Sequence, residues 1–226
     1  MTQKTSPQSI GIILDGNRRW AREHNLPTLE GHRRGYEKTK EIVRWAKDAG
    51  IRYVTVYAFS TENWNRTPEE VAYLMDLFRS FLSKEVAYMK DEGVRILCAG
   101  ERERFAPDIQ ECMKQAETET AGESKVVLTL ALSYGGRAEI VVAANRASAL
   151  GPITEETLSK HMWVQNTPDP DLIIRTGGEM RLSGFMTWQS VYSELFFTKT
   201  KLPDLSEEEF KQILSEFDVR ERRNGV

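Results

Sequence analysis

The stretch GIILDGNRRWAREH places the carboxylate of Asp15 and two arginines, Arg18 and Arg19, directly after an apolar run. Arginine guanidinium groups donate paired hydrogen bonds to phosphate, and a helix beginning near Asn17 adds the positive end of its dipole. A lone acid among such bases suits Mg²⁺, which prefers oxygen ligands and often bridges a carboxylate to phosphates. The stretch therefore indicates a site for a metal-bound phosphate ester with Asp15 as the metal ligand. Taken alone, Asp15 fits a helix cap equally well.

Polar and glycine-rich segments follow four of the strands that the sequence predicts. They read DGNRR, STENWNR, SYGGR and RTGGEMRLSG. The carboxyl ends of strands in an open parallel sheet share one edge, where ligands collect. Glycine pairs let backbone N–H groups approach an anion, although tight turns are their commoner use. Side chains distant in sequence can therefore converge at this edge, and the candidates are Asp15, Ser60, Asn63, Arg66, Arg175, Arg181 and Ser183.

Alternating strand and helix patterns predict the frame that positions these segments. Apolar or β-branched runs predict strands over residues 9–14, 51–59, 94–100, 125–133, 171–176 and 190–197. Caps and helical spacing predict helices over residues 36–50, 67–93, 102–119, 137–149, 154–162 and 205–222. We expect a single α/β domain over residues 1–226, with a mostly parallel sheet of about six strands flanked by helices. Residues 1–8 are expected to form a disordered tail.

Composition and missing motifs exclude several classes of protein. The net charge of −3 over 226 residues gives no reason to expect nucleic acid as a partner. The two cysteines make no zinc pattern, and a disulfide framework is not expected. The P-loop, dinucleotide, nucleophile-elbow and zinc-protease motifs are absent, as is the DDxxD of helical trans-prenyltransferases. With no signal peptide and no apolar run of about 20 residues, we expect a cytoplasmic protein whose membrane contact is peripheral.

Five segments together resemble the cis-prenyltransferases, most closely those of the undecaprenyl diphosphate synthase type. They are ILDGNRRWA, GHRRG, YAFSTENWNR, YGGR and DLIIRTGGEMRLSGFMTWQSVYSELFF, in this order from about residue 10 onward. The resemblance implies a homodimeric, Mg²⁺-dependent α/β enzyme that extends an allylic diphosphate, such as farnesyl diphosphate, with isopentenyl diphosphate. A long product, undecaprenyl diphosphate, is expected. A shorter or different product is the alternative, and a non-catalytic binding subunit is a weaker one.

The resemblance also implies a role for each matching residue. Asp15 would hold Mg²⁺, with Glu194 as a second acid acting across the dimer. The allylic diphosphate would lie on Gly16, Asn17, Arg18, Arg19 and Trp20, near His32, and isopentenyl diphosphate on Arg175, Arg181 and Ser183. Ser60, Thr61, Glu62, Asn63, Trp64 and Arg66 would form a loop over the reacting carbons. Asn63 or a diphosphate oxygen would position the proton loss. Arg223 and Gly225 would reach into the partner's site.

A growing hydrocarbon requires an apolar channel. One face of the helix predicted over residues 67–93 carries Val71, Leu74, Met75, Phe78, Leu82 and Val86. Such a stripe by itself indicates core packing, but with the resemblance part of it is expected to line a hydrophobic tunnel. The chain departs from the family at Thr28, where arginine is usual, and at Ser133 and Gly184, where asparagine is common.

Overall fold

A parallel sheet forms the centre of the computed structural model, which describes residues 6–165 and 167–220. The order of its six strands is β3-β4-β2-β1-β5-β6, and every neighbouring pair runs parallel. This confirms the predicted α/β sheet and places β1 between β2 and β5, so the segments that follow these three strands meet at one edge. The strands are β1 (Ser9–Ile13), β2 (Tyr53–Ser60), β3 (Val94–Ala99), β4 (Val126–Tyr134), β5 (Leu172–Arg175) and β6 (Glu194–Phe197).

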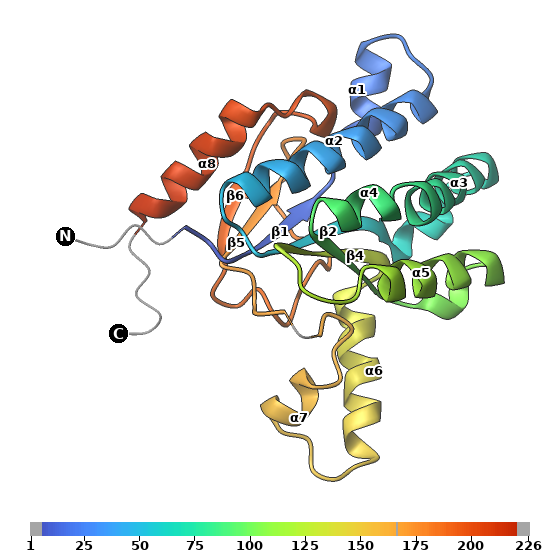
Figure 1. The fold of residues 1–226 in the computed structure, drawn as a ribbon, viewed down its shortest axis with the longest axis vertical. Helices are drawn as coiled ribbons and strands as arrows, with labels where there is room; N and C mark the ends of the chain where they lie inside the picture. Colours follow the sequence, from blue (N-terminus) through green and yellow to red (C-terminus); the bar gives the residue numbers. More distant parts are fainter. Residues whose placement is uncertain (1–5, 166, 221–226) are drawn as a thin grey trace.

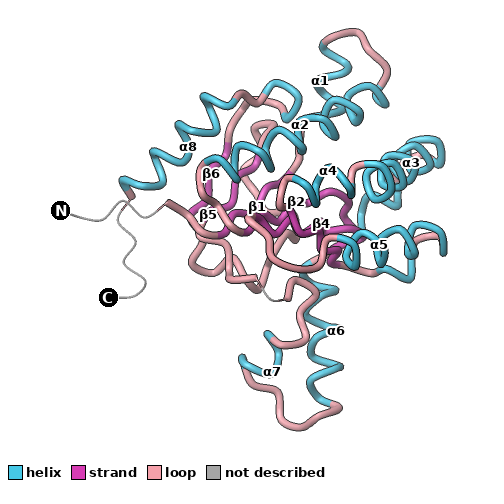
Figure 2. The backbone as a smooth tube through the Cα atoms, viewed as in Figure 1, coloured by secondary structure: helices cyan, strands magenta, loops and turns pink. Residues whose placement is uncertain are grey.

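Helices enclose this sheet, as the tube in Figure 2 shows. Helices α6 and α7 project on one side of it, and α2 and α8 lie on the other (Figure 1). The α-helices are α1 (Asn17–Glu23), α2 (Thr28–Asp48), α3 (Pro68–Lys84), α4 (Val86–Asp91), α5 (Pro107–Glu119), α6 (Gly136–Ser148), α7 (Glu155–Ser159) and α8 (Glu207–Val219). Three short 3₁₀ helices are η1 (Thr61–Asn65), η2 (Arg102–Arg104) and η3 (Leu202–Asp204).

Each strand divides its side chains between two apolar layers. Ile12 and Val56 pack with the helices of one face, in the larger core cluster. Ile13 and Tyr57 point to the other face, where they pack with Phe185. Burial on both faces is the reason these strands read as continuous apolar runs rather than as alternating ones.

Two predicted helices are divided in the structure. The helix expected over residues 67–93 is two helices, α3 and α4, which meet at Glu85. The helix expected over residues 102–119 is the 3₁₀ turn η2 followed by α5, because Pro107 lacks an N–H donor and suits a first helical position.

The start of α2 also differs from the prediction, by eight residues. The helix begins at Thr28 rather than at residue 36. Its first turns contain two glycines, which weaken the helical signal. A Cβ at Gly31 would lie 2.1 Å from the carbonyl oxygen of Asn17, so glycine allows α1 to pack directly on α2. Tertiary packing therefore outweighs local propensity here.

Two other predicted segments have different ends in the structure, and hydrogen bonds explain the differences. Strand β6 begins at Glu194 rather than at residue 190, because the Ser193 N–H donates to the Ser190 carbonyl in a turn and the Ser193 hydroxyl donates to the Pro170 carbonyl. Of the tail expected over residues 1–8, residues 1–5 lie outside the described residues. Pro7 is buried, and the Gln8 N–H donates to Asp171 Oδ2 over 2.8 Å. Pro7 and Gln8 therefore belong to the folded domain. Within the described part of the chain, no helix is long and apolar enough to cross a membrane.

Candidate active site

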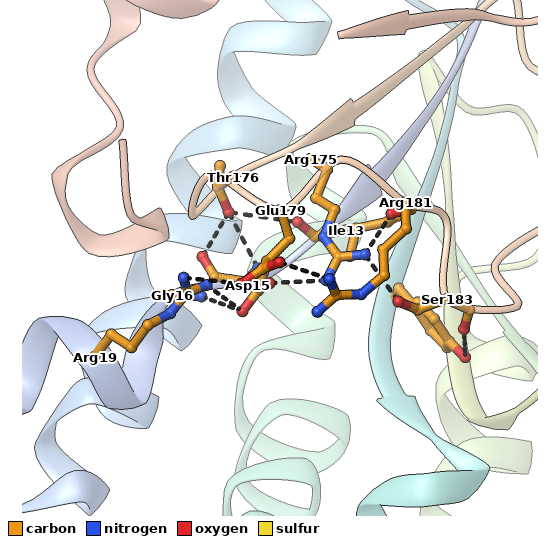
Figure 3. A network of polar contacts seen from close by, with 10 residues as sticks. Ile13, Asp15, Gly16, Arg19, Arg175, Thr176, Glu179, Arg181 and Ser183 are labelled. Carbon is orange, nitrogen blue, oxygen red and sulfur yellow. Dashed lines mark hydrogen bonds and ion pairs between the residues drawn. The ribbon is translucent and has the colours of Figure 1, made fainter. Parts of the chain in front are cut away.

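The carboxylate of Asp15 lies between two guanidinium groups where β1 and β5 end (Figure 3). Ile13 pairs with Arg175 in the sheet register, so the residues that follow each strand are neighbours. Arg175 Nη2 lies 2.9 Å from Asp15 Oδ2, and Arg19 Nη2 lies 3.1 Å from Asp15 Oδ1. Asp15 and Arg175, which are 160 positions apart in the sequence, are thus in direct contact. The prediction that residues following neighbouring strands converge at one edge of the sheet includes this pair.

The backbone around Asp15 is fixed by its own hydrogen bonds. The Asp15 N–H donates to Thr176 Oγ1 over 3.0 Å, and the Thr176 hydroxyl donates to the Asp15 carbonyl over 2.6 Å. Gly16 follows with φ of 106°, a conformation that L side chains rarely adopt, and caps α1. A Cβ there would lie 2.8 Å from that of Lys201. The glycine is therefore required by the turn that aims Asp15 at this edge.

Asp15 is an ionised acid at neutral pH. Burial alone would raise the pKa of its carboxyl, but the hydrogen bond from Arg175 and the charge of Arg19 outweigh it. The pKa of Asp15 is therefore lowered. A half-exposed carboxylate held in its charged form beside arginines is a suitable ligand for a hard divalent cation.

The segment after β5 folds back onto Arg175. Arg175 Nη1 donates to Ser183 Oγ over 2.8 Å and to the Arg181 carbonyl oxygen. Ser183 and Gly184 both have left-handed backbones, with φ of 51° and 77°. Asparagine and glycine both tolerate this region, so the departure at Gly184 leaves the loop conformation accessible. Arg175, Arg181 and Ser183 thus come together as predicted.

Arg175 and Arg181 differ in how far their side chains are exposed to solvent. Arg175 is buried, whereas the Arg181 side chain is 61% exposed and pairs with Glu179 over 2.6 Å. Glu179 also lies 3.5 Å from Arg19 Nη1. Glu179 therefore links the arginine after β1 with the arginine after β5, and Arg181 is free to turn toward a ligand.

The segment after β2 forms the 3₁₀ helix η1. The Ser60 N–H donates to Asn63 Oδ1 over 3.0 Å in a capping box. Trp64 packs on Phe59 and donates from Nε1 to Ser133 Oγ over 2.9 Å. Ser133 thus supports the loop through its hydroxyl, although its φ of 48° favours asparagine or glycine.

The carboxylate of Glu70, a residue that was not predicted to belong to the site, lies close to three of the predicted basic side chains. Its Oε1 lies 2.9 Å from His32 Nε2, 3.0 Å from Arg66 Nη1 and 3.8 Å from Arg18 Nε. Glu70 is 6% exposed. Glu70 stands three residues after Thr67, whose hydroxyl caps α3, and an acid is common at this position for capping alone. The i, i+4 spacing from Arg66 was the available signal.

The charges in this group shift the pKa values of Glu70 and His32. Burial alone would raise the pKa of Glu70, but the His32 hydrogen bond and the charge of Arg66 hold it below its usual value. Burial lowers the pKa of His32 more than the Glu70 hydrogen bond raises it. His32 is therefore neutral at pH 7, and the net positive charge near Glu70 comes from the two arginines.

A cavity of about 410 Å³ begins at these polar groups and continues between the sheet and the helices. Its polar lining includes Asp15, Gly16, Asn17, Arg18, Arg19, His32, Asn63 and Arg66. Its apolar lining comes from β2, β4 and α3. These elements contribute Val56, Leu130, Leu132, Leu74, Leu77, Phe78, Phe81 and Leu82. Of the predicted stripe, Leu74, Phe78 and Leu82 line the cavity. Val71, Met75 and Val86 pack in the core.

Other predicted residues lie away from the cavity. Trp20 is buried against η3, where Nε1 donates to Asp204 Oδ1 over 2.6 Å. Ser60, Thr61 and Glu62 border the site without lining the cavity. Glu194 begins β6 in register with Leu172, at the opposite end of the sheet from Asp15, and pairs with Arg220 over 2.6 Å. Arg223 and Gly225 lie outside the described residues.

The donor set fits a metal shared with a ligand rather than a metal cage. Among the described residues, no group of three or more His, Cys, Asp or Glu side chains could hold a metal ion. Mg²⁺ is commonly bound by one or two carboxylates together with substrate phosphates, and Asp15 at the cavity mouth supplies one such carboxylate. The surrounding arginines suit the phosphates of that ligand.

An open parallel α/β sheet that carries arginines and the ionised Asp15 at the mouth of an apolar cavity suits a ligand that is anionic at one end and apolar at the other. Residues 13–225 match the family model described as putative undecaprenyl diphosphate synthase. The chain belongs to this family of cis-prenyltransferases, as the five sequence segments predict.

Individual relatives support the same assignment. The isoprenyl transferase of Chromobacterium violaceum is 46% identical over 97% of this chain and 88% of the relative. That of Thermotoga maritima is 41% identical over 97% of both. Lavandulyl diphosphate synthase from Lavandula x intermedia, solved with dimethylallyl diphosphate, superposes with a TM-score of 0.94 at 33% identity, covering 98% of this chain and 99% of its own. A probable undecaprenyl diphosphate synthase from Campylobacter jejuni superposes with a TM-score of 0.84 at 29% identity, covering 98% and 100%.

Glu70→Gln tests whether the charge of this buried acid stabilises the site. We expect it to lower the free energy of unfolding by about 1–3 kcal/mol at pH 7, because an amide cannot replace a carboxylate that pairs with arginines. The pKa of Glu70 is lowered from 4.5, so this stabilisation is complete above pH 4.5 and is lost as the pH falls through the folded value.

Urea unfolding at pH 7 and at successive pH values below 4.5 measures the difference between the two proteins. The exposed ion-pair residue Glu41, changed to Gln, is the matched control on α2 and is expected to change stability by less than about 0.5 kcal/mol. A difference for Glu70→Gln that stays constant over the whole pH range would contradict the charge assignment.

Proposed function

We propose that this cis-prenyltransferase condenses isopentenyl diphosphate onto an allylic diphosphate such as farnesyl diphosphate and releases a polyprenyl diphosphate. The observation that carries the proposal is a cavity whose lining extends from Asp15, Arg18 and Arg19 to an apolar interior. One end suits diphosphate and the other suits a hydrocarbon chain. Undecaprenyl diphosphate is the product that the sequence resemblance favours, and a shorter prenyl diphosphate is the alternative.

The allylic diphosphate would bind at the start of α1. Arg18 and Arg19 line the cavity mouth together with the backbone of Gly16 and Asn17. The side-chain oxygen of Asn17 is buried without a hydrogen-bond partner, which supports a role toward a ligand. His32 and Arg66, held by Glu70, would complete this side and offset the missing arginine at Thr28.

Isopentenyl diphosphate would bind on the β5 side. Arg181 is exposed beside Ser183, and buried Arg175 holds both that loop and Asp15. The two diphosphates would then lie on either side of the Asp15 carboxylate, which would hold Mg²⁺ together with their phosphates, as is common for this ion. When bound, Mg²⁺ would offset the negative charge of the diphosphates.

The residues support the expected condensation through charge. As the allylic C–O bond breaks, negative charge grows on the departing diphosphate, and Arg18 and Arg19 would stabilise it. The double bond of isopentenyl diphosphate attacks the allylic carbon, and a proton is then lost. Asn63 lines the cavity with its carbonyl oxygen engaged by the Ser60 N–H, so its amide N–H₂ group is the part that would orient a diphosphate oxygen for that step.

A homodimer forms part of the proposal. Glu194 lies at the opposite end of the sheet from the Asp15 of its own chain, so a role toward the metal would require the partner subunit. Arg223 and Gly225 would likewise act in the partner's site. We further propose a cytoplasmic enzyme that contacts the membrane through its lipid product.

Asp15→Ala is expected to lower turnover by a factor of about 10²–10³ or more while the fold remains. The change removes the protein ligand of Mg²⁺ and with it stabilisation of the leaving diphosphate. Product formation from labelled isopentenyl diphosphate measures the effect, and circular dichroism reports the fold. Asp15→Asn keeps a partner for Arg175 and should be similarly inactive. Near-normal turnover by either folded variant would show that the metal assignment is wrong.

Arg181→Ala and Arg19→Ala are expected to affect different substrates. Arg181→Ala should mainly raise the KM for isopentenyl diphosphate, and Arg19→Ala should mainly weaken the allylic substrate and slow turnover. Loss of one charge-assisted contact costs about 1.5–3 kcal/mol, or roughly tenfold to a hundredfold in affinity.

Steady-state kinetics with each substrate varied in turn separates the two effects. Arg44→Ala, at an exposed position of α2, is the control and should leave both KM values unchanged. Equal effects of Arg181→Ala and Arg19→Ala on both substrates would be incompatible with two separate diphosphate sites.

A further inference from the structure

The loop after β5, which carries Arg181 and Ser183, has a backbone that needs support from outside. Ser183 and Met186 have φ of 51° and 44°, and Gly184 between them has φ of 77°. Serine and methionine rarely adopt this left-handed region, and they remain in it only where the surrounding structure fixes them. Contacts from other segments must therefore hold Ser183 against Arg175.

The glycine pair after β4 supplies one of these contacts. The Gly136 N–H donates to the Gly184 carbonyl oxygen over 2.7 Å. A Cβ at Gly136 would lie 2.7 Å from that same oxygen, so glycine allows the turn after β4 to approach the loop after β5. Neither Gly135 nor Gly136 lines the cavity. The turn therefore supports the loop without meeting a ligand in the cavity.

The hydroxyl of Tyr57 supplies a second contact and joins the same two segments. It donates to the Tyr134 carbonyl oxygen over 3.1 Å and to the Ser183 carbonyl oxygen over 3.3 Å. A phenol has one hydrogen, so the two carbonyls share it. The Tyr57 ring is buried and stacks on Phe185, with centroids 4.9 Å apart and planes at 20°. The hydroxyl is thus fixed at the point where the turn after β4 meets the loop after β5.

The surroundings of Tyr57 keep its phenol a hydrogen-bond donor. Burial and the charge of Glu62 raise the pKa of Tyr57, and the Ser60 hydroxyl and the charge of Arg175 oppose this rise without cancelling it. The phenol is therefore protonated at neutral pH. Tyr57 borders the cavity, but its hydrogen is shared by two backbone carbonyls. Its hydroxyl can therefore act on the loop after β5 rather than donate to a substrate.

We propose that Tyr57 is a positioning residue for isopentenyl diphosphate, because it fixes Ser183 and, through Ser183, the arginines of the β5 side. The inference rests on the proposed function and adds a residue to which the resemblance gives no role. Ser183 Oγ accepts from Arg175 Nη1 over 2.8 Å, and Arg175 also donates to the Arg181 carbonyl oxygen (Figure 3). Without the hydroxyl of Tyr57, the left-handed backbone at Ser183 is freer to relax, and these donors lose the fixed geometry that a diphosphate requires.

Tyr57→Phe isolates the hydroxyl, because the stacked ring remains. Steady-state kinetics with each substrate varied in turn are expected to show the KM for isopentenyl diphosphate raised about threefold to tenfold, the effect of one neutral hydrogen bond. The KM for the allylic substrate and the turnover at saturation should be unchanged. Tyr53→Phe, at the other end of β2, removes the same atom from a half-buried tyrosine and is the control. Circular dichroism reports the fold of each variant.

A double-mutant cycle tests whether Tyr57 acts through Ser183. Ser183→Ala removes the oxygen that receives Arg175, and by itself it should raise the KM for isopentenyl diphosphate. In that background Tyr57→Phe is expected to add less than about twofold, because the hydroxyl that Tyr57 positions is gone. If the two changes multiply fully, Tyr57 acts by another route and the inference is wrong.

The other outcomes separate the inference from the proposed function. A folded Tyr57→Phe enzyme with the wild-type KM for isopentenyl diphosphate would overturn the inference and leave the proposed function intact. Equal rises in the KM values of both substrates would show a general loosening of the site, and would also overturn the inference. A wild-type protein that forms no prenyl diphosphate would overturn the proposed function, and the inference with it.

Discussion

The ion pair between Asp15 and Arg175 connects the two halves of the site and depends on the order of strands. Because β5 lies directly beside β1, a residue after one strand meets the last residue of the other. Arg175 then extends the contact to Ser183 and to the loop that carries Arg181. The same carboxylate receives Arg19 from the other side. The site thus has one acid at its centre and a cationic region on each side.

Such an arrangement is costly without a ligand. Several arginines face one another at the cavity mouth, and only acids such as Glu70 and Glu179 separate them. A buried carboxylate that pairs with cations contributes specificity of position more than net stability. Glu70 fixes His32 and Arg66 at the entrance, and Glu179 pairs with Arg19 and Arg181. Anionic ligands would replace part of these contacts, which gives the acids a role in keeping the bases in place.

Sequence reasoning predicted the frame of this protein well, for a physical reason. Strands buried on both faces produce continuous apolar runs, and polar residues at their carboxyl ends stand out against them. This is why Asp15, Arg175 and Ser183 could be placed together from spacing alone. Boundaries were less accurate where tertiary contacts decide, as at the start of α2, where Gly31 permits contact with α1.

Other features had at most a weak local signal in the sequence. Glu70 looks like a capping acid in the sequence, and its role in the site emerges only when α2 and α3 cross. The resemblance places Trp20 beside the allylic diphosphate and Trp64 on the loop over the reacting carbons, but in the structure both donate hydrogen bonds to groups that do not line the cavity. The hydrogen bond from Tyr36 to Glu85 joins α2 to the junction of α3 and α4, in a region where one long helix was predicted.

The central claim is that one cavity holds two diphosphates at its mouth and a growing hydrocarbon inside. The most direct measurement is the mass of the lipid that the wild-type protein forms from farnesyl diphosphate and isotopically labelled isopentenyl diphosphate with Mg²⁺, compared with the same mixture containing a chelator. The account predicts a series of prenyl diphosphates in steps of one labelled five-carbon unit, formed only when Mg²⁺ is available. Binding of both substrates without any such product, or equal product formation in the chelator, would contradict it.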